Sequence, residues 1–140
     1  VFSTKHQQRW IAADIAPRLY AYVGGIVREH GGVLLAMGGI EDHVHLYIRW
    51  RQDSAVSEMM RTIKAASSKW LHDTYPHLGD FAWQDGYAAF TVAKQGERAL
   101  KDYIAGQREH HHHTGEDFAG ELRRLLDERG VEYEERYLLD

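Results

Sequence analysis

Hydrophobic positions in the first half of the chain change their spacing several times, and each spacing predicts a different element. The run "VFSTK" at residues 1–5 predicts a short first strand. Between residues 15 and 30, apolar side chains recur at every third or fourth position, which predicts a helix with one buried face. "VLLAMGG" (33–39) and "HVHLYIRW" (43–50) then predict two more strands around the turn-like "GGIED".

The second half is predicted to be mainly helical. Asp53 or Ser54 is expected to cap a second helix that carries its own apolar stripe. A fourth strand is predicted from about Tyr87 to Ala93, followed by a third helix over about 97–112. An amphipathic helix with apolar positions between 118 and 126 completes the pattern.

This order of elements, β-α-β-β-α-β followed by helices, indicates an α+β fold. We expect a ferredoxin-like (RRM-like) antiparallel sheet with helices on one face, plus C-terminal helices. The other face of the sheet would then be open to a ligand. No internal repeat or low-complexity linker interrupts the 140 residues, which fits one domain.

Charge is unevenly distributed along the chain. The net charge is -4, yet residues 115–140 alone hold 9 acidic and 4 basic side chains, whereas residues 1–114 carry a slight positive excess and all 10 histidines. The acidic total therefore does not exclude nucleic acid as a partner.

Cysteine is absent, which excludes disulfides and thiolate chemistry and fits a cytoplasmic protein. No apolar run approaches the roughly 20 residues that span a bilayer, so we expect no membrane association. The sequence carries no recognisable signal peptide. Because Val1 already lies in a strand-like run, we expect the natural start to lie further upstream.

Two histidines in the third predicted strand are the first candidates for chemistry. Side chains two apart on a strand point the same way, so His43 and His45 would project together and form a preorganised pair for a divalent metal. Asp42 would orient one imidazole or simply end the turn. The alternative for an isolated His-x-His pattern is one surface histidine and one satisfied by a neighbour.

The third predicted helix adds a tyrosine and a glutamine. Tyr103 and Gln107 are four residues apart and share a helical face. Tyrosine offers a phenolic nucleophile and glutamine a neutral oxygen ligand. Two histidines and one amide oxygen would leave positions open on Mg²⁺ or Mn²⁺ for a phosphate oxygen. The alternative is a core tyrosine beside a solvated glutamine.

Four segments together point to a family. "HVHLYI", "KAASSKW", "FAWQDGYAAFTV" and "YIAGQ", in this order, closely resemble the single-tyrosine HUH transposases of the insertion-sequence 200/605 type, which are related to the REP-associated tyrosine transposases. The resemblance implies that His43 and His45 bind the metal, that Gln107 is the third ligand and that Tyr103 is the nucleophile. It extends over nearly the whole chain.

The resemblance also implies a reaction and partners. In the family the tyrosine attacks a phosphate of single-stranded DNA at a hairpin end, which gives a 5′-phosphotyrosyl enzyme and a free 3′-hydroxyl that later rejoins strands. Members are homodimers in which the tyrosine helix of one subunit often completes the partner's site. Residues 1–114 would be the catalytic domain with its tyrosine helix, and 115–140 an acidic C-terminal helix or tail of that domain.

Other side chains are candidates for contact with DNA. The candidates are basic and polar residues on the second predicted helix, basic residues after the first strand and one tryptophan. They are Lys5, Arg9, Arg61, Lys64, Ser68, Lys69 and Trp83. An ordinary solvated basic face is the alternative for the helix. His110 or His111 would fall near the Tyr103 face, although a solvated helix end is the favoured interpretation.

Three other functions stay open at this point. The first is a domesticated relative that nicks or rejoins host repeat hairpins. The second is a non-catalytic single-stranded DNA-binding module. A metal hydrolase of small phosphodiesters is the third possibility, and it predicts turnover without a protein-linked intermediate.

Overall fold

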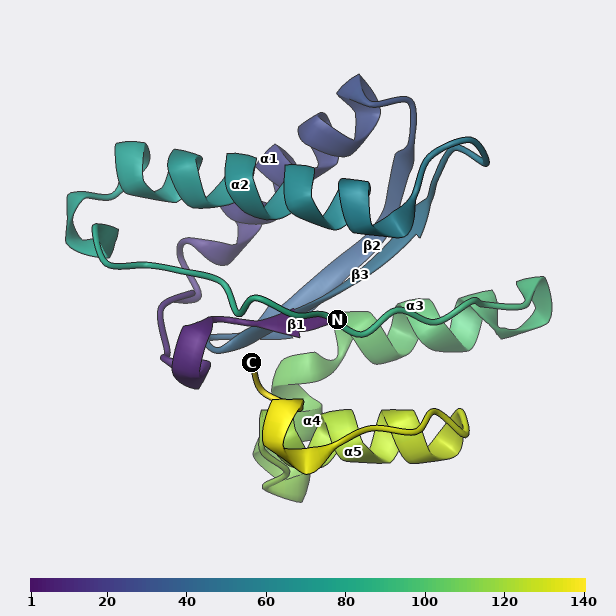
Figure 1. Cartoon of the computed structure of the whole chain (residues 1–140). Helices are drawn as coiled ribbons and strands as arrows, with labels where there is room; N and C mark the ends of the chain where they lie inside the picture. Colours follow the sequence, from purple (N-terminus) through teal and green to yellow (C-terminus); the bar gives the residue numbers. More distant parts are fainter.

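An antiparallel sheet lies at the centre of the computed structural model, which describes residues 1–140 (Figure 1). Its strands are β1 (Phe2–Ser3), β2 (Val33–Ile40) and β3 (His43–Arg49), in the order β1-β3-β2. The central strand β3 pairs with both neighbours, and its register with β2 places Gly38 opposite His45. The predicted α+β class is confirmed, and the predicted histidine strand is the middle of the sheet.

Two helices, α1 (Ala16–Glu29) and α2 (Val56–Thr74), cover one face of the sheet (Figure 1). The main core lies there, where Leu19 and Val27 of α1 and Ile63 of α2 pack with Val44 of β3. The predicted side-chain caps of α2 are not used, because Ala55 occupies the N-cap and no side chain bonds to the first turn.

Three further helices lie on the other side of the sheet (Figure 1): α3 (Glu97–Ala105), α4 (Gln107–Thr114) and α5 (Phe118–Glu128). The face that we expected to be open is therefore covered. Side chains alternate along β3, so Val44 points toward α1 and α2 while His43 and His45 point toward these later helices. The predicted histidine pair faces a closed interior and not bulk solvent.

The predicted third helix is divided in two at Gly106, where α3 ends and α4 begins. Gly115, with a φ of 68°, then ends α4 in the left-handed conformation that glycine adopts at low cost. Asp117 caps α5, because its side chain accepts a hydrogen bond from the amide of Gly120 (2.8 Å). This short turn allows α5 to fold back beside α4.

The predicted fourth strand, from about Tyr87 to Ala93, is not a strand in the structure. The preceding residues run beside β1 through one antiparallel bridge, between Thr4 and Trp83. The amides of Asp85 and Gly86 then donate to the carbonyl of Asp140 and not to the sheet. Pairing with the N-terminal segment resumes at Ala88, which exchanges two hydrogen bonds with Val1, so the contacts along this edge are interrupted and form no regular ladder.

Candidate active site

His43 and His45 are held by the central strand with almost no exposure to solvent, 0% and 3% respectively. The Nδ1 of His43 donates to a carboxylate oxygen of Asp42 at 2.7 Å. This contact fixes the ring and directs Nε2 toward the later helices. The predicted orienting role of Asp42 is thus consistent with the geometry.

A glycine on the neighbouring strand allows α3 to approach this pair closely. A Cβ atom built on Gly38 would lie 2.1 Å from the carbonyl oxygen of Ile104, so any larger residue would push α3 away. Because Gly38 is opposite His45, the contact brings the ring of Tyr103 to 5.7 Å from that of His45. The predicted nucleophile and the histidine pair therefore meet within one chain.

Gln107 is the first residue of α4 and is 1% exposed. Its Oε1 lies 3.0 Å from Nε2 of His43, and its Nε2 donates to Glu121 at 3.1 Å. The break at Gly106 lets the side chain enter the site from the start of a new helix. All four residues predicted for the catalytic centre are brought together by the structure.

Glu121 of α5 is a member of the site that sequence reasoning missed. Its side chain is fully buried, and Oε1 lies 3.0 Å from Nε2 of His43 and 3.1 Å from Nε2 of His45. Its other oxygen accepts a hydrogen bond from the hydroxyl of Tyr103. The signal was present, because a carboxylate at position 121 interrupts the apolar face that Phe118 and Leu122 define.

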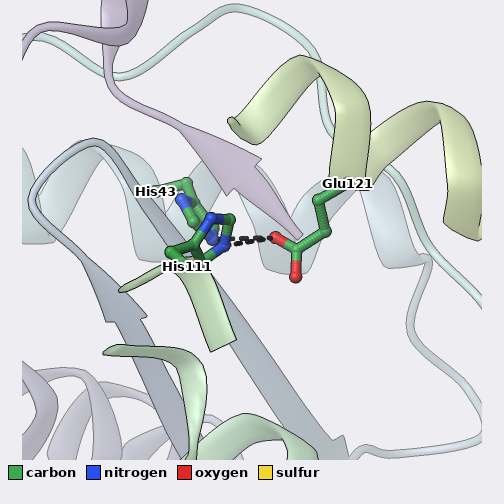
Figure 2. A group of neighbouring side chains, drawn as sticks. All are labelled: His43, His111 and Glu121. Carbon is green, nitrogen blue, oxygen red and sulfur yellow. Dashed lines mark hydrogen bonds and ion pairs between the residues drawn. The ribbon is translucent and has the colours of Figure 1, made fainter. Parts of the chain in front are cut away.

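His111 is the second residue that the sequence analysis placed elsewhere. Its side chain is 7% exposed and lies in the site, not at a solvated helix end, since its Nε2 lies 3.2 Å from Glu121 and 3.1 Å from Oε1 of Gln107. Figure 2 shows the imidazoles of His43 and His111 facing the carboxylate of Glu121. The ligand atoms of these three residues lie within 4.8 Å of one another, which makes them a possible metal-binding group.

Charge in the site is concentrated on Glu121 and His43. Burial alone would raise the pKa of Glu121, but hydrogen bonds from His43 and His45 outweigh it and hold that pKa well below its usual range. Burial would lower the pKa of His43, yet bonds to Asp42 and Glu121 raise it to about 9. His45 shares only Glu121, so burial dominates and lowers its pKa to about 4.

The hydroxyl of Tyr103 has a raised pKa, about 12, first because of burial and second because of its bond to Glu121. The phenol is therefore neutral at ordinary pH. The carboxylate of Glu121 accepts a hydrogen bond from this hydroxyl and so orients it in the site.

The residues predicted to contact DNA lie in two regions, one formed by α2 and residues 82–87 and the other just after β1. A groove of about 460 Å³ runs between α2 and residues 82–87, and Arg61, Lys64 and Ser68 are among the residues that line it. Lys64 is partly buried there and its ammonium donates to the carbonyls of three successive residues, Gln84, Asp85 and Gly86. Lys64 therefore holds the loop of residues 84–86 against α2.

Trp83 is 6% exposed, and its indole N–H donates to the hydroxyl of Ser67 at 3.0 Å. Its ring is packed in the core between other aromatic rings, which leaves no face open for a base. Lys69 pairs with Asp73 on the exposed side of α2. Arg9 pairs with Glu41, and Lys5 is exposed nearby.

With the sheet, the histidine strand and the tyrosine helix in place, the fold and site define a known class of protein. A family model described as "Transposase IS200 like" matches residues 1–107. The chain belongs to this transposase family, as the sequence motifs predicted. It is a DNA transposase by family, and none of its helices combines the length and hydrophobicity that a membrane crossing requires.

Two relatives from Deinococcus radiodurans illustrate the similarity. The chain is 23% identical over 114 residues to the ISDra2 transposase TnpA, which covers 78% of this chain and 81% of that protein. The crystal structure of a candidate transposase from the same organism aligns with a TM-score of 0.62 at 23% identity, over 76% of this chain and 85% of that one. At this identity the structural likeness supports the fold.

The family match ends at Gln107, so most of α4 and all of α5 lie beyond it. His111 and Glu121 therefore come from a part of the chain that the family model does not describe. The possible metal-binding group combines one residue from the matched region with two from outside it.

Proposed function

We propose that this protein cleaves and rejoins single-stranded DNA at hairpin ends through a 5′-phosphotyrosine intermediate on Tyr103. One observation supports this most directly: the carboxylate of Glu121 is surrounded within one chain by the hydroxyl of Tyr103, the rings of His43 and His45 and the amide of Gln107. A nucleophile beside a buried cluster of metal ligands is the arrangement that phosphodiester transfer needs.

The residues present fit a divalent metal. His43, His45 and Gln107 are the ligands that the motifs predict, and His111 and Glu121 add two more donors of suitable type. The Nε2 atoms of the three histidines each lie 3.0–3.2 Å from Oε1 of Glu121 or Oε1 of Gln107, so these nitrogen and oxygen atoms converge on one place and would hold the ion there. Mg²⁺ or Mn²⁺, when bound, polarises the scissile phosphate and stabilises charge on the departing oxygen.

Glu121 orients the phenol of Tyr103 by accepting its hydrogen bond. In cleavage the tyrosine oxygen forms a bond to phosphorus, the bond from phosphorus to the 3′ oxygen breaks, and the phenolic proton is transferred to that departing oxygen. The departing oxygen thereby becomes a 3′-hydroxyl. The reverse sequence rejoins strands, because the phosphotyrosyl bond conserves the energy of the broken diester. No nucleotide hydrolysis is needed.

The groove beside α2 is the surface that we propose for the hairpin. Arg61 is exposed there, Ser68 offers a hydroxyl and Tyr87 is 39% exposed, so phosphate contacts and base stacking are both available. Lys5, Arg9 and Lys69 would add charge at the periphery, while Lys64 acts through the loop that it fastens. A homodimer stays a prediction from the resemblance, and a cytoplasmic location stays a prediction from the absence of cysteine.

The proposal is tested with a pool of single-stranded hairpins labelled at either end. We expect a covalent protein–DNA adduct with Mg²⁺ or Mn²⁺ that EDTA abolishes. The label at the 3′ end should remain on the protein, because the 5′ phosphate of the downstream fragment is linked to tyrosine. Binding without adduct would favour a non-catalytic module, and turnover of small phosphodiesters without adduct would favour a hydrolase.

A further inference from the structure

Helix α5 supplies two charged groups to the oxygen of Tyr103, and it lies wholly beyond the family match. One is Glu121, whose carboxylate accepts a hydrogen bond from the hydroxyl. The other is Arg124, whose Nη2 donates to the same oxygen at 2.8 Å. The two are three residues apart and share one face of the helix, so a single turn of α5 presents a carboxylate and a guanidinium together.

Arg124 is held firmly in this position. Its Nε and Nη2 each lie 3.1 Å from an oxygen of Glu116, and Nη1 reaches Glu128 at 3.4 Å. Its guanidinium carbon is 5.8 Å from the centre of the Tyr103 ring. A guanidinium with carboxylates on two sides is preorganised, so little conformational freedom remains to be lost when it contacts the tyrosine oxygen.

The other polar groups around the tyrosine oxygen are not cationic donors to it. The carboxylate of Glu121 accepts a hydrogen bond from the hydroxyl, and the side-chain amide of Gln107 donates to the same carboxylate. The ring of His110 lies 5.5 Å from that of Tyr103 but pairs with Glu116. Arg124 is the one cationic side chain that donates a hydrogen bond to this oxygen.

We propose that Arg124 is a catalytic residue of the phosphotyrosyl transfer, which orients the Tyr103 oxygen and stabilises its negative charge. The inference rests on the proposed function. In cleavage the tyrosine oxygen forms its bond to phosphorus, the bond to the 3′ oxygen breaks, and the phenolic proton is finally carried by the released 3′-hydroxyl. In rejoining the 3′-hydroxyl attacks and the tyrosine oxygen leaves. Arg124 stays protonated and bonded to that oxygen in both directions.

The experiment measures single-turnover adduct formation at saturating hairpin DNA for wild type, Arg124→Ala and Arg124→Lys. We expect the alanine variant to be slowed about 100-fold, the scale found when one donor to a developing charge is removed. The lysine variant should be intermediate, because it keeps the charge and loses the planar fork. The DNA dissociation constant should stay within about twofold of wild type, since the lost interaction acts on the tyrosine.

Guanidinium added at a non-denaturing concentration should restore part of the rate to Arg124→Ala and leave wild type unchanged. A structural role would not produce this rescue. The matched control is Arg123→Ala on the same helix, because Arg123 pairs with Glu135 away from the site. We expect that variant to react at the wild-type rate.

Three results would overturn the assignment, and they can be distinguished. A wild-type rate for Arg124→Ala refutes the role of Arg124 alone. A slow variant that guanidinium does not restore, with a lowered thermal unfolding temperature, shows that Arg124 only supports the fold. A wild-type protein that never forms an adduct refutes the proposed function together with this inference.

Discussion

Replacing Tyr103 by phenylalanine is expected to abolish the covalent DNA adduct and to leave hairpin binding unchanged. Phenylalanine lacks the oxygen that would attack phosphorus, yet it retains the ring that packs against His45 and His110. The loss should be about 10⁴-fold or more in rate, as for the removal of other enzymatic nucleophiles. Denaturing gels with end-labelled hairpins measure the adduct, and fluorescence anisotropy measures binding.

Tyr137→Phe provides the matched control, because this tyrosine is 58% exposed and lies outside the site. It should form adduct at the wild-type rate. An adduct that persists in Tyr103→Phe at wild-type yield would show that another residue is the nucleophile, and peptide mapping of the linked fragment would then identify it.

The second large effect is expected at Glu121. Glu121→Ala removes the carboxylate that pairs with the buried His43 and His45, so a histidine must lose its proton or stay unpaired. We expect a loss of about 3 kcal/mol in the free energy of unfolding of the metal-free protein, the scale for breaking a buried ion pair. Urea denaturation followed by circular dichroism measures this change.

The variant Glu121→Gln separates charge from shape. Its amide fills the same volume but is a weaker ligand, so calorimetric titration with Mn²⁺ should give an affinity lower by about tenfold or more. Glu128→Gln on the same helix is the control, because that side chain is 57% exposed and should change neither property appreciably. An unchanged Mn²⁺ affinity in Glu121→Gln would exclude this carboxylate from the metal site.

Much of the candidate site could be predicted from local spacing in the sequence. His43 and His45 share a face because a strand alternates, and Tyr103 and Gln107 are close because they are four apart. The apolar pattern also located α1, α2 and α5 to within a few residues. These features depend on residues that are close together in the sequence, so the sequence alone was enough to predict them.

The missed features depend on contacts between distant segments. Glu121 and Arg124 reach Tyr103 only because the turn at Gly115 folds α5 back beside α4. The predicted fourth strand is wrong for a related reason, since the amides of Asp85 and Gly86 bond to Asp140 and interrupt the pairing with the N-terminal segment, which resumes at Ala88. Periodicity does not encode such partners, so the sequence favoured a strand there and a solvated helix end at the histidine run.

The close packing of α3 on Gly38 has a consequence for how molecules cooperate. Every group that we assign to the proposed reaction is drawn from the same polypeptide, so we expect one copy to be a complete reaction unit. A chain lacking its nucleophile and a chain lacking His43 would each be defective, and an equal mixture of them would stay inactive. Trans-complementation between such mutants, if observed, would mean that the tyrosine helix is exchanged between copies when DNA is bound.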